Sequence, residues 1–175
     1  EPGRYLSVIA RAEPENSLLE IVEGFSRKPR GMKLTVLGKY EDGNAYHQAV
    51  KAAAGNEVMF LGAIYDKKVV QALRFHSAAY VHGHQVGGTN PSLVEALGAG
   101  NAVIAHDNRF NRWVAGPGAA FFDGAAGFAT QLDAILADPT RLDSMRKASR
   151  ERFLAEFQWE KILSEYETLL LKYQK

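Results

Sequence analysis

An α/β domain with a doubly wound, parallel sheet is the fold class that the sequence predicts. Short apolar or β-branched runs alternate with segments of helical period along the chain. Runs such as residues 33–38 are apolar without period-two alternation, which is typical of buried parallel strands. Strict alternation of this kind implies helices on both faces of one sheet. Right-handed crossovers then favour a Rossmann-like winding of about six strands followed by C-terminal helices.

The expected elements follow the chain in order. Strands are predicted at Tyr5–Ala10, Lys33–Leu37, Val58–Leu61, Ala78–His82, Ala102–His106 and Ala119–Phe122. Helices are predicted near residues 17–27, 45–54, 66–77, 91–99 and 126–137, and the chain closes with helices. Two helix starts carry capping signals. Ser17 and Glu20 have capping-box spacing, and Asn90 is an N-cap residue directly before Pro91.

The last helix, from about Trp159 to Tyr173, is amphipathic. Its apolar residues recur at helical spacing, so we expect it to pack on the core of its own domain. Two alternatives remain open for it. It could be a strap that reaches a partner domain, or a membrane-surface helix, although a mixed rather than basic polar face disfavours the latter.

Length and composition predict one domain over residues 1–175. The net charge of +1, from 21 basic and 20 acidic residues without long single-sign blocks, disfavours a nucleic-acid binder. Cysteine is absent, which excludes disulfides and thiol metal sites. No signal peptide and no apolar run of roughly 18 residues is found, so a cytoplasmic location is expected. The opening Glu1-Pro2-Gly3, without an initiator Met, indicates an excised domain.

A ligand crevice is predicted where the strand order reverses, between the carboxyl ends of the first and fourth strands. The loop after the first strand, residues 11–16, carries Arg11, a permanent cation suited to a diphosphate. The loop after the fourth, residues 83–89, contains Gly87 and Gly88, which permit a close backbone approach to a ligand.

The helix that follows this loop completes the predicted site. Thr89 and Asn90 begin it, and its free amides suit a phosphate. Glu95 lies about one turn in and could accept both ribose hydroxyls. Each residue also has a simpler interpretation: a tight turn for the glycines, an ion pair with Glu13 or Glu15 for Arg11, and a solvated position for Glu95. Their convergence on one crevice favours the binding site.

The other polar motifs are weaker. His82-Gly83-His84 resembles a metal-ligand spacing, but no third ligand is placed nearby, so no metal is expected. His84 could instead face the ligand and donate to a sugar hydroxyl or a phosphate. A Walker loop and a G-x-G-x-x-G turn after the first strand are both missing, which leaves ATP and dinucleotide sites of the usual kinds unsupported.

Several motifs together resemble the C-terminal, donor-binding domain of a family 4 retaining glycosyltransferase with the GT-B architecture. The segment "IARAEPEN" resembles the family's first strand and arginine loop, "VLG" and "FLG" its second and third strand ends, and "GGTNPSLVEALGAGNAVIA" its donor signature. The wording "GGTNPSLVEA", with "DNRFNRWVAG" downstream, is most similar to bacterial rhamnosyltransferases of polysaccharide assembly.

The resemblance implies a role for each matching residue. Glu95 would bind the donor ribose, and Arg11 would neutralise the diphosphate. The segment Gly87, Gly88, Thr89, Asn90 and Ser92 would face the diphosphate and sugar, and backbone groups at Gly38, Gly62, Ala63 and Ile64 would seat the base. Two positions depart from the family pattern: the first signature glutamate is Gly87, and the lysine after the arginine is Asn16. His84, Asn90 or Lys39 are the residues that could compensate.

The function expected from these features is transfer of a sugar, rhamnose being one candidate, from a nucleotide diphosphate sugar to a carbohydrate or lipid-linked acceptor. No cofactor or metal is expected, and the N-terminal acceptor domain would lie outside this chain. The full-length protein would be peripheral at the inner membrane. Two alternatives are a non-enzymatic nucleotide-binding module and half of a sugar-nucleotide epimerase. A response-regulator form of the former would need clustered acidic residues after the first strand and a phosphoacceptor aspartate, and neither is found. Catalytic acid-base residues at the crevice would favour the latter, and only Glu95 and the histidines are candidates for that role.

Overall fold

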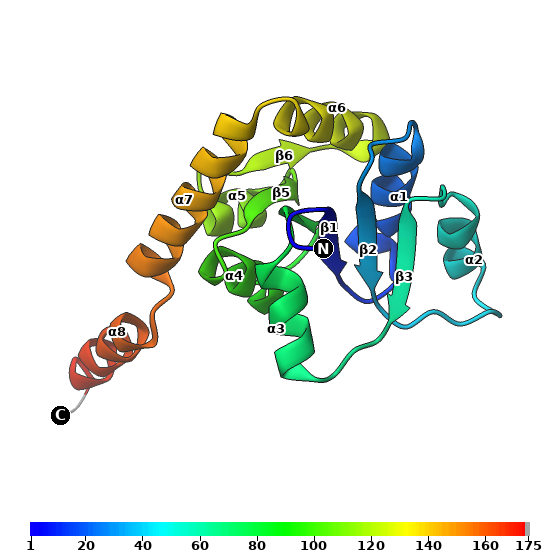
Figure 1. The fold of residues 1–175 in the computed structure, drawn as a ribbon. Helices are drawn as coiled ribbons and strands as arrows, with labels where there is room; N and C mark the ends of the chain where they lie inside the picture. Colours follow the sequence, from blue (N-terminus) through cyan, green and yellow to red (C-terminus); the bar gives the residue numbers. More distant parts are fainter. Residues whose placement is uncertain (174–175) are drawn as a thin grey trace.

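The computed structural model describes residues 1–173 and contains one six-stranded parallel sheet (Figure 1). The strands are β1 (Tyr5–Ile9), β2 (Lys33–Leu37), β3 (Val58–Gly62), β4 (Ala79–His82), β5 (Ala102–His106) and β6 (Ala120–Phe122). Their order across the sheet is β3-β2-β1-β4-β5-β6. This is the Rossmann-like order, so the predicted fold class and the reversal point between β1 and β4 are confirmed.

The α-helices connect the strands and close the chain. They are α1 (Leu18–Ser26), α2 (Ala45–Ala52), α3 (Lys67–Phe75), α4 (Pro91–Gly98), α5 (Arg109–Ala115), α6 (Gly124–Leu136), α7 (Pro139–Glu156) and α8 (Trp159–Leu171), with a 3-10 turn at Pro14–Asn16. The expected strands and helices all form, with ends shifted by a few residues. The short α5 was not predicted, and α7 was anticipated only as a closing helix without bounds.

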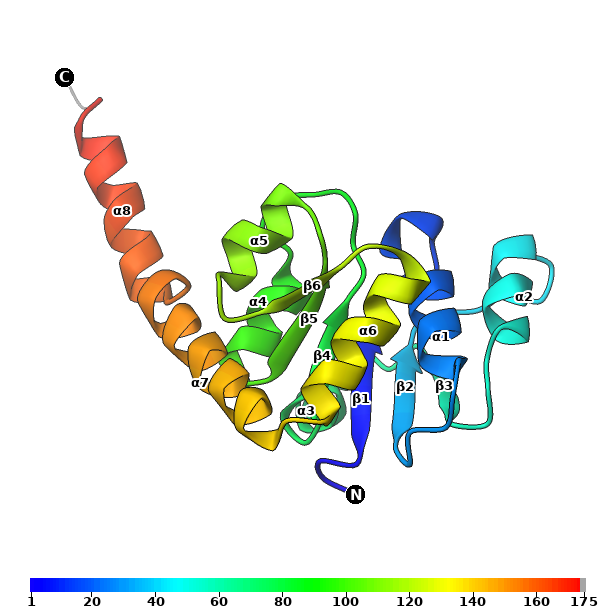
Figure 2. The same ribbon diagram turned by 90° about the horizontal axis from the view of Figure 1, so that it is seen from above.

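Alternate side chains of β1 show how the two faces of the sheet are covered. Leu6 and Val8 join the larger apolar core, which includes residues of α1 and α6. Tyr5 points to the opposite face, where its hydroxyl donates to the Leu73 carbonyl of α3 at 2.6 Å. A second apolar cluster on that face joins α4, α5 and the end of α7 (Figure 2). The sheet is therefore buried on both sides, as its continuous apolar strands predict.

The predicted capping box at Ser17 is wrong. Ser17 lies at the junction of the 3-10 turn and α1 with a φ of 49°, and its side chain caps no helix amide. An N-cap hydroxyl reaches the amides of the first turn from an extended backbone, which a left-handed residue does not provide. The Ser17 hydroxyl instead accepts from the Gln85 side chain at 3.0 Å. The second predicted start is confirmed, because Asn90 Oδ1 accepts from the Ser92 amide at 3.0 Å.

The expectation that the last helix packs on its own core is also wrong. Helix α8 continues away from the sheet beyond α7 (Figures 1 and 2), and it has no buried residue. Its large apolar side chains are exposed, for example Trp159, Leu163, Tyr166 and Leu170. Periodicity revealed the apolar face of this helix but not what covers it. Within residues 1–173, no helix is long and apolar enough to cross a membrane.

Candidate functional site

The loops after β1 and β4 meet at the carboxyl edge of the sheet, where these two strands lie side by side. The Gln85 amide donates to the Glu15 carbonyl at 2.8 Å, which joins the two loops through their backbones. Gly83 packs so closely that a Cβ on it would collide with the Asn16 carbonyl oxygen. The residues that the sequence assigned to a crevice therefore lie on two segments in direct contact.

The loop that carries Arg11 is held from beneath. Asn16 donates its side-chain amide to the Arg11 carbonyl at 2.9 Å. The buried His47 ring bridges two loops: its Nδ1 accepts from the Glu41 amide at 2.8 Å, so its Nε2 donates to the Ala12 carbonyl at 2.8 Å. The sequence indicated no role for His47, because the residues next to it in the chain do not show that α2 directs its ring toward the Arg11 loop. The backbone of the arginine loop is thus fixed.

The Arg11 side chain itself is exposed. None of the ion pairs found among residues 1–173 involves Arg11, so the surface pairing with Glu13 or Glu15 does not occur there. Its positive charge contributes to lowering the pKa of His84, second to burial of that ring. A guanidinium in this state is available to an anionic ligand.

Two stacked histidines lie at the carboxyl end of β4. The rings of His82 and His84 lie nearly parallel with their centroids 4.3 Å apart. Burial lowers the pKa of His82 to about 3, and the proximity of His84 adds to that shift. Burial, followed by the charge of Arg11, also lowers the pKa of His84. Both rings are therefore neutral at pH 7, and the partly exposed His84 can donate or accept a hydrogen bond.

Two asparagines of helix α5 and its N-cap hold the histidine loop in place. The side-chain amides of Asn108 and Asn111 both donate to the His84 carbonyl, at 2.9 and 2.8 Å. Asn111 is buried and also donates to the His106 carbonyl at 2.9 Å. Sequence reasoning noted this segment only as part of a resemblance. The sequence signal that could have indicated these two residues is the Asn-x-x-Asn pattern at 108–111, which begins two residues after the last residue of a buried strand.

The glycine-rich segment before α4 is open to solvent. Gly87 and Gly88 are exposed, and Gly87 has a φ of 121°, a conformation that other residues rarely adopt. Thr89 is exposed as well, and the Asn90 cap with Pro91 at the first helical position sets the direction of α4. The free amides expected at this helix start are taken, because Ser92 and Leu93 donate theirs to Asn90. The start of α4 therefore offers the positive end of its dipole, and the exposed backbone of residues 87–89 lies next to it.

Within α4, Ser92 and Glu95 are tied to groups beneath the helix. The Ser92 hydroxyl lies 2.6 Å from the hydroxyl of the buried Tyr80, so it is engaged inside the domain. The Glu95 carboxylate is largely exposed, but its Oε2 pairs with Arg74 Nη2 at 2.8 Å. Sequence reasoning assigned no role to Arg74 or Tyr80.

The positions assigned to the nucleoside follow β2 and β3. The Gly38 amide donates to the Gly62 carbonyl at 3.0 Å, and a Cβ on Gly38 would come within 2.5 Å of the Ala10 carbonyl oxygen. Ala63 is exposed and Ile64 partly so. Ile64 and Glu95 both line a groove of about 1530 Å³ between α3, α4 and the start of α8. The expected ribose contact thus shares a groove with one of the four expected base positions.

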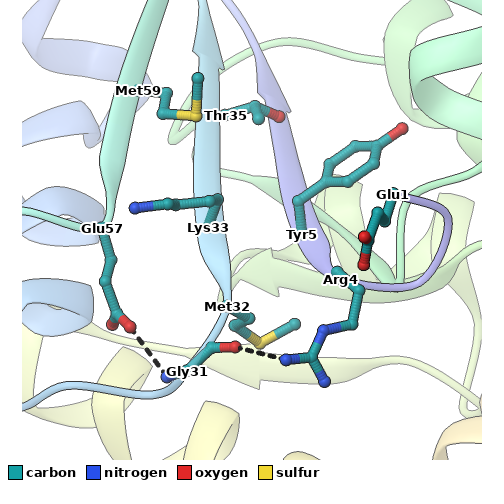
Figure 3. A pocket seen from close by; sticks show the side chains of 9 residues that line it. All are labelled: Glu1, Arg4, Tyr5, Gly31, Met32, Lys33, Thr35, Glu57 and Met59. Carbon is teal, nitrogen blue, oxygen red and sulfur yellow. Dashed lines mark hydrogen bonds between the residues drawn. The ribbon is translucent and has the colours of Figure 1, made fainter.

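A smaller pocket of about 510 Å³ lies at the opposite, amino-terminal edge of the strands (Figure 3). Its polar groups are occupied within the fold. Glu57 accepts from the Gly31 amide at 2.8 Å, and Arg4 donates to the Gly31 carbonyl at 3.1 Å. No predicted site residue lines it, and ligands of open α/β sheets bind at the other edge.

Comparisons with known proteins agree with this fold. Residues 1–152 match the family described as "Glycosyl transferases group 1". No curated protein matches the chain. Among solved structures, the chain superposes on sucrose-phosphate synthase from Thermosynechococcus elongatus with a TM-score of 0.84 at 20% identity, covering 98% of this chain and 46% of that one.

Two further solved structures are similar to this chain, and one of them is an isolated C-terminal domain. HepE from Anabaena, solved in complex with UDP, gives a TM-score of 0.84 at 15% identity over 97% of this chain and 49% of that one. The C-terminal domain of the group 1 glycosyl transferase LpcC from Francisella tularensis gives 0.74 at 18% identity, covering 90% and 88%. The chain thus spans less than half of the first two proteins and has the fold of the isolated C-terminal domain.

Proposed function

The chain belongs to the group 1 glycosyl transferases, and we propose that it is the donor-binding domain of an enzyme that moves a sugar from a nucleotide diphosphate sugar to a carbohydrate or lipid-linked acceptor. The observation that carries this proposal is the direct contact between the loop of Arg11 and the loop that precedes α4, through the bond from the Gln85 amide to the Glu15 carbonyl. Arg11 forms no ion pair within residues 1–173, and the helix start is open to solvent. Both are suited to a diphosphate, and Glu95 lies one turn behind them.

The proposed chemistry is stabilisation of the departing diphosphate. As the bond between sugar and diphosphate breaks, negative charge develops on the leaving group. The Arg11 guanidinium and the amides around Gly88 and Thr89 would interact with that charge in a fixed geometry, which lowers the barrier. Glu95 would bind the ribose hydroxyls, and backbone groups at 38 and 62–64 would seat the base. The resemblance to family 4 enzymes supports each of these assignments.

The sugar side of the site is proposed to involve His84. Where the resembled family has a glutamate that contacts the transferred sugar, this chain has Gly87 without a side chain. His84 lies in the same loop and is partly exposed, and burial together with the charge of Arg11 lowers its pKa, so its ring is neutral at pH 7. A neutral imidazole suits a sugar hydroxyl. Rhamnose is our candidate sugar, and uridine, thymidine and guanosine are the candidate nucleosides.

The acceptor is proposed to bind between this domain and an N-terminal domain of the same protein. Helix α8 supports this view, because its apolar face is exposed along its length. We propose that this face packs against the N-terminal domain in the full-length, cytoplasmic protein, which would associate peripherally with the inner membrane.

The direct test of donor binding is calorimetry with UDP, dTDP, GDP, ATP and NAD on the 175-residue chain. Binding of one of the three diphosphates more tightly than ATP or NAD is the expected result. Failure of all three diphosphates to bind a chain that is folded by circular dichroism would refute the proposal.

A transfer assay tests the division of labour between domains. This chain should bind donor yet transfer no sugar, because transfer requires an acceptor held near the anomeric carbon, an effect worth several kcal/mol of barrier. The control is the same protein extended by its natural N-terminal region, with matched donor and acceptor. Equal transfer rates for the two proteins would show that the active site is complete within these residues.

A further inference from the structure

We propose that Arg74 of helix α3 is a positioning residue for the donor nucleoside: it fixes the Glu95 carboxylate in the orientation that receives the ribose. This inference rests on the proposed function, because it takes Glu95 as the ribose contact. It adds a residue outside the predicted motifs, on a helix to which the sequence assigned no part of the site.

The geometry joins a buried cation to an exposed anion. The Arg74 side chain is only 4% exposed, whereas that of Glu95 is 59% exposed, and Arg74 Nη2 lies 2.8 Å from Glu95 Oε2. Arg74 has no other carboxylate partner among residues 1–173, and its Nε has no partner there. A buried guanidinium needs a counterion, since an unpaired buried charge is costly. The carboxylate is therefore held from below.

One carboxylate oxygen stays open in this arrangement. No hydrogen bond to Glu95 Oε1 is found among the described residues, and the side chain faces the groove lined by Ile64 and Thr89. A long surface glutamate normally samples several rotamers, and ordering it on ligand binding costs free energy. The pairing with Arg74 imposes that order before the nucleotide arrives.

Arg74 is itself held by a hydrogen-bonded chain. Its Nη2 lies 3.4 Å from the Ser92 hydroxyl, which lies 2.6 Å from the Tyr80 hydroxyl. The Tyr80 hydroxyl donates to the Ile9 carbonyl at 3.3 Å, at the end of β1 and two residues before Arg11. Because Tyr80 is fully buried, this chain links α3 and α4 to the sheet. Contacts with buried groups of the domain therefore hold the Arg74 side chain in place.

The test uses whichever of UDP, dTDP and GDP binds most tightly, together with its 3′-deoxy analogue. In the unmodified chain the 3′-hydroxyl should improve affinity about tenfold, as a charge-assisted hydrogen bond does. Arg74→Met should reduce that ratio severalfold, because the carboxylate is then free to move, while Arg74→Lys should recover part of it. Glu95→Gln should also reduce the ratio, and adding Arg74→Met to Glu95→Gln should change it little further.

The matched control is Arg30→Met. Arg30 is also a buried arginine, 2% exposed, paired at 3.2 Å with a partly exposed carboxylate, Asp133 of α6. Arg30 lies in the loop before β2, at the amino-terminal edge of the strands, whereas the expected donor site lies at their carboxyl edge. Its loss should therefore lower the thermal midpoint and leave the affinity ratio between the nucleotide and its 3′-deoxy analogue unchanged. If Arg74→Met has the same affinity ratio between the nucleotide and its 3′-deoxy analogue as the unmodified chain, the inference is overturned, while donor binding stands. A ratio insensitive to Glu95→Gln would overturn it as well, and absence of any nucleotide binding would overturn the proposed function with it.

Discussion

Replacing His82 by leucine should make the domain less sensitive to acid. His82 is 1% exposed, and both of its ring nitrogens lack a partner among the described residues. Its pKa falls from 6.5 to about 3 on folding, because burial penalises the charged ring. A depressed histidine pKa means that the folded state binds fewer protons than the unfolded chain. Stability is therefore full above pH 6.5 and is lost as pH falls toward 3.

The size of the effect follows from that shift. Each pKa unit corresponds to about 1.4 kcal/mol, so the full loss below pH 3 is on the order of 5 kcal/mol. At pH 5 the unfolded chain has already taken up its proton and the folded state has not, which costs about 2 kcal/mol relative to pH 8. Against a typical domain stability of about 5–15 kcal/mol, such a change is easily measured.

The assay is reversible urea unfolding at pH 8 and pH 5, followed by circular dichroism. His82→Leu should lose about 2 kcal/mol less than the unmodified chain between the two values of pH. At pH 8 the variant should differ by no more than about 1 kcal/mol, since leucine removes two unsatisfied polar atoms. His76→Leu, at an exposed position, is the control. Equal losses in His82→Leu and the unmodified chain would refute the reasoning.

Three further changes test other parts of the site. Arg11→Ala should weaken a nucleoside diphosphate by about 1.5–3 kcal/mol while sparing the nucleoside, and equal losses in calorimetry would place Arg11 away from the phosphates. Gly83→Ala should lower the thermal midpoint and weaken nucleotide binding, since a Cβ would collide with the Asn16 carbonyl; a variant that matches the unmodified chain in both would contradict this. Asn111→Leu should cost about 1–3 kcal/mol in urea unfolding by leaving the His84 and His106 carbonyls short of a donor, and an unchanged midpoint would count against that role.

The elements that could be predicted are those whose signals are local. Apolar runs such as residues 102–106 identified the strands, and the handedness of crossovers then ordered them. Asn90 and Pro91 identified a helix start for the same reason, because both signals lie within two residues. The short helix α5 was missed since its seven residues give too little periodicity.

The features that could not be predicted depend on contacts between distant segments. Arg74 is an ordinary residue of a helix's last turn by sequence, and only the crossing of α3 and α4 buries it beside Glu95. His47 and Asn111 likewise gain their roles from loops 35 and 27 residues away. Ser17 had the right neighbours for a cap, but the preceding turn forces it to a positive φ.

The conformation of Gly87 also constrains how this loop can change by mutation. The resembled family has a glutamate at this position, whereas here the backbone has a φ of 121°, which side chains other than hydrogen rarely tolerate. Replacing Gly87 by glutamate would impose backbone strain of about 1–3 kcal/mol before any contact could form. A chain with glutamate at this position therefore requires a differently shaped loop between β4 and α4.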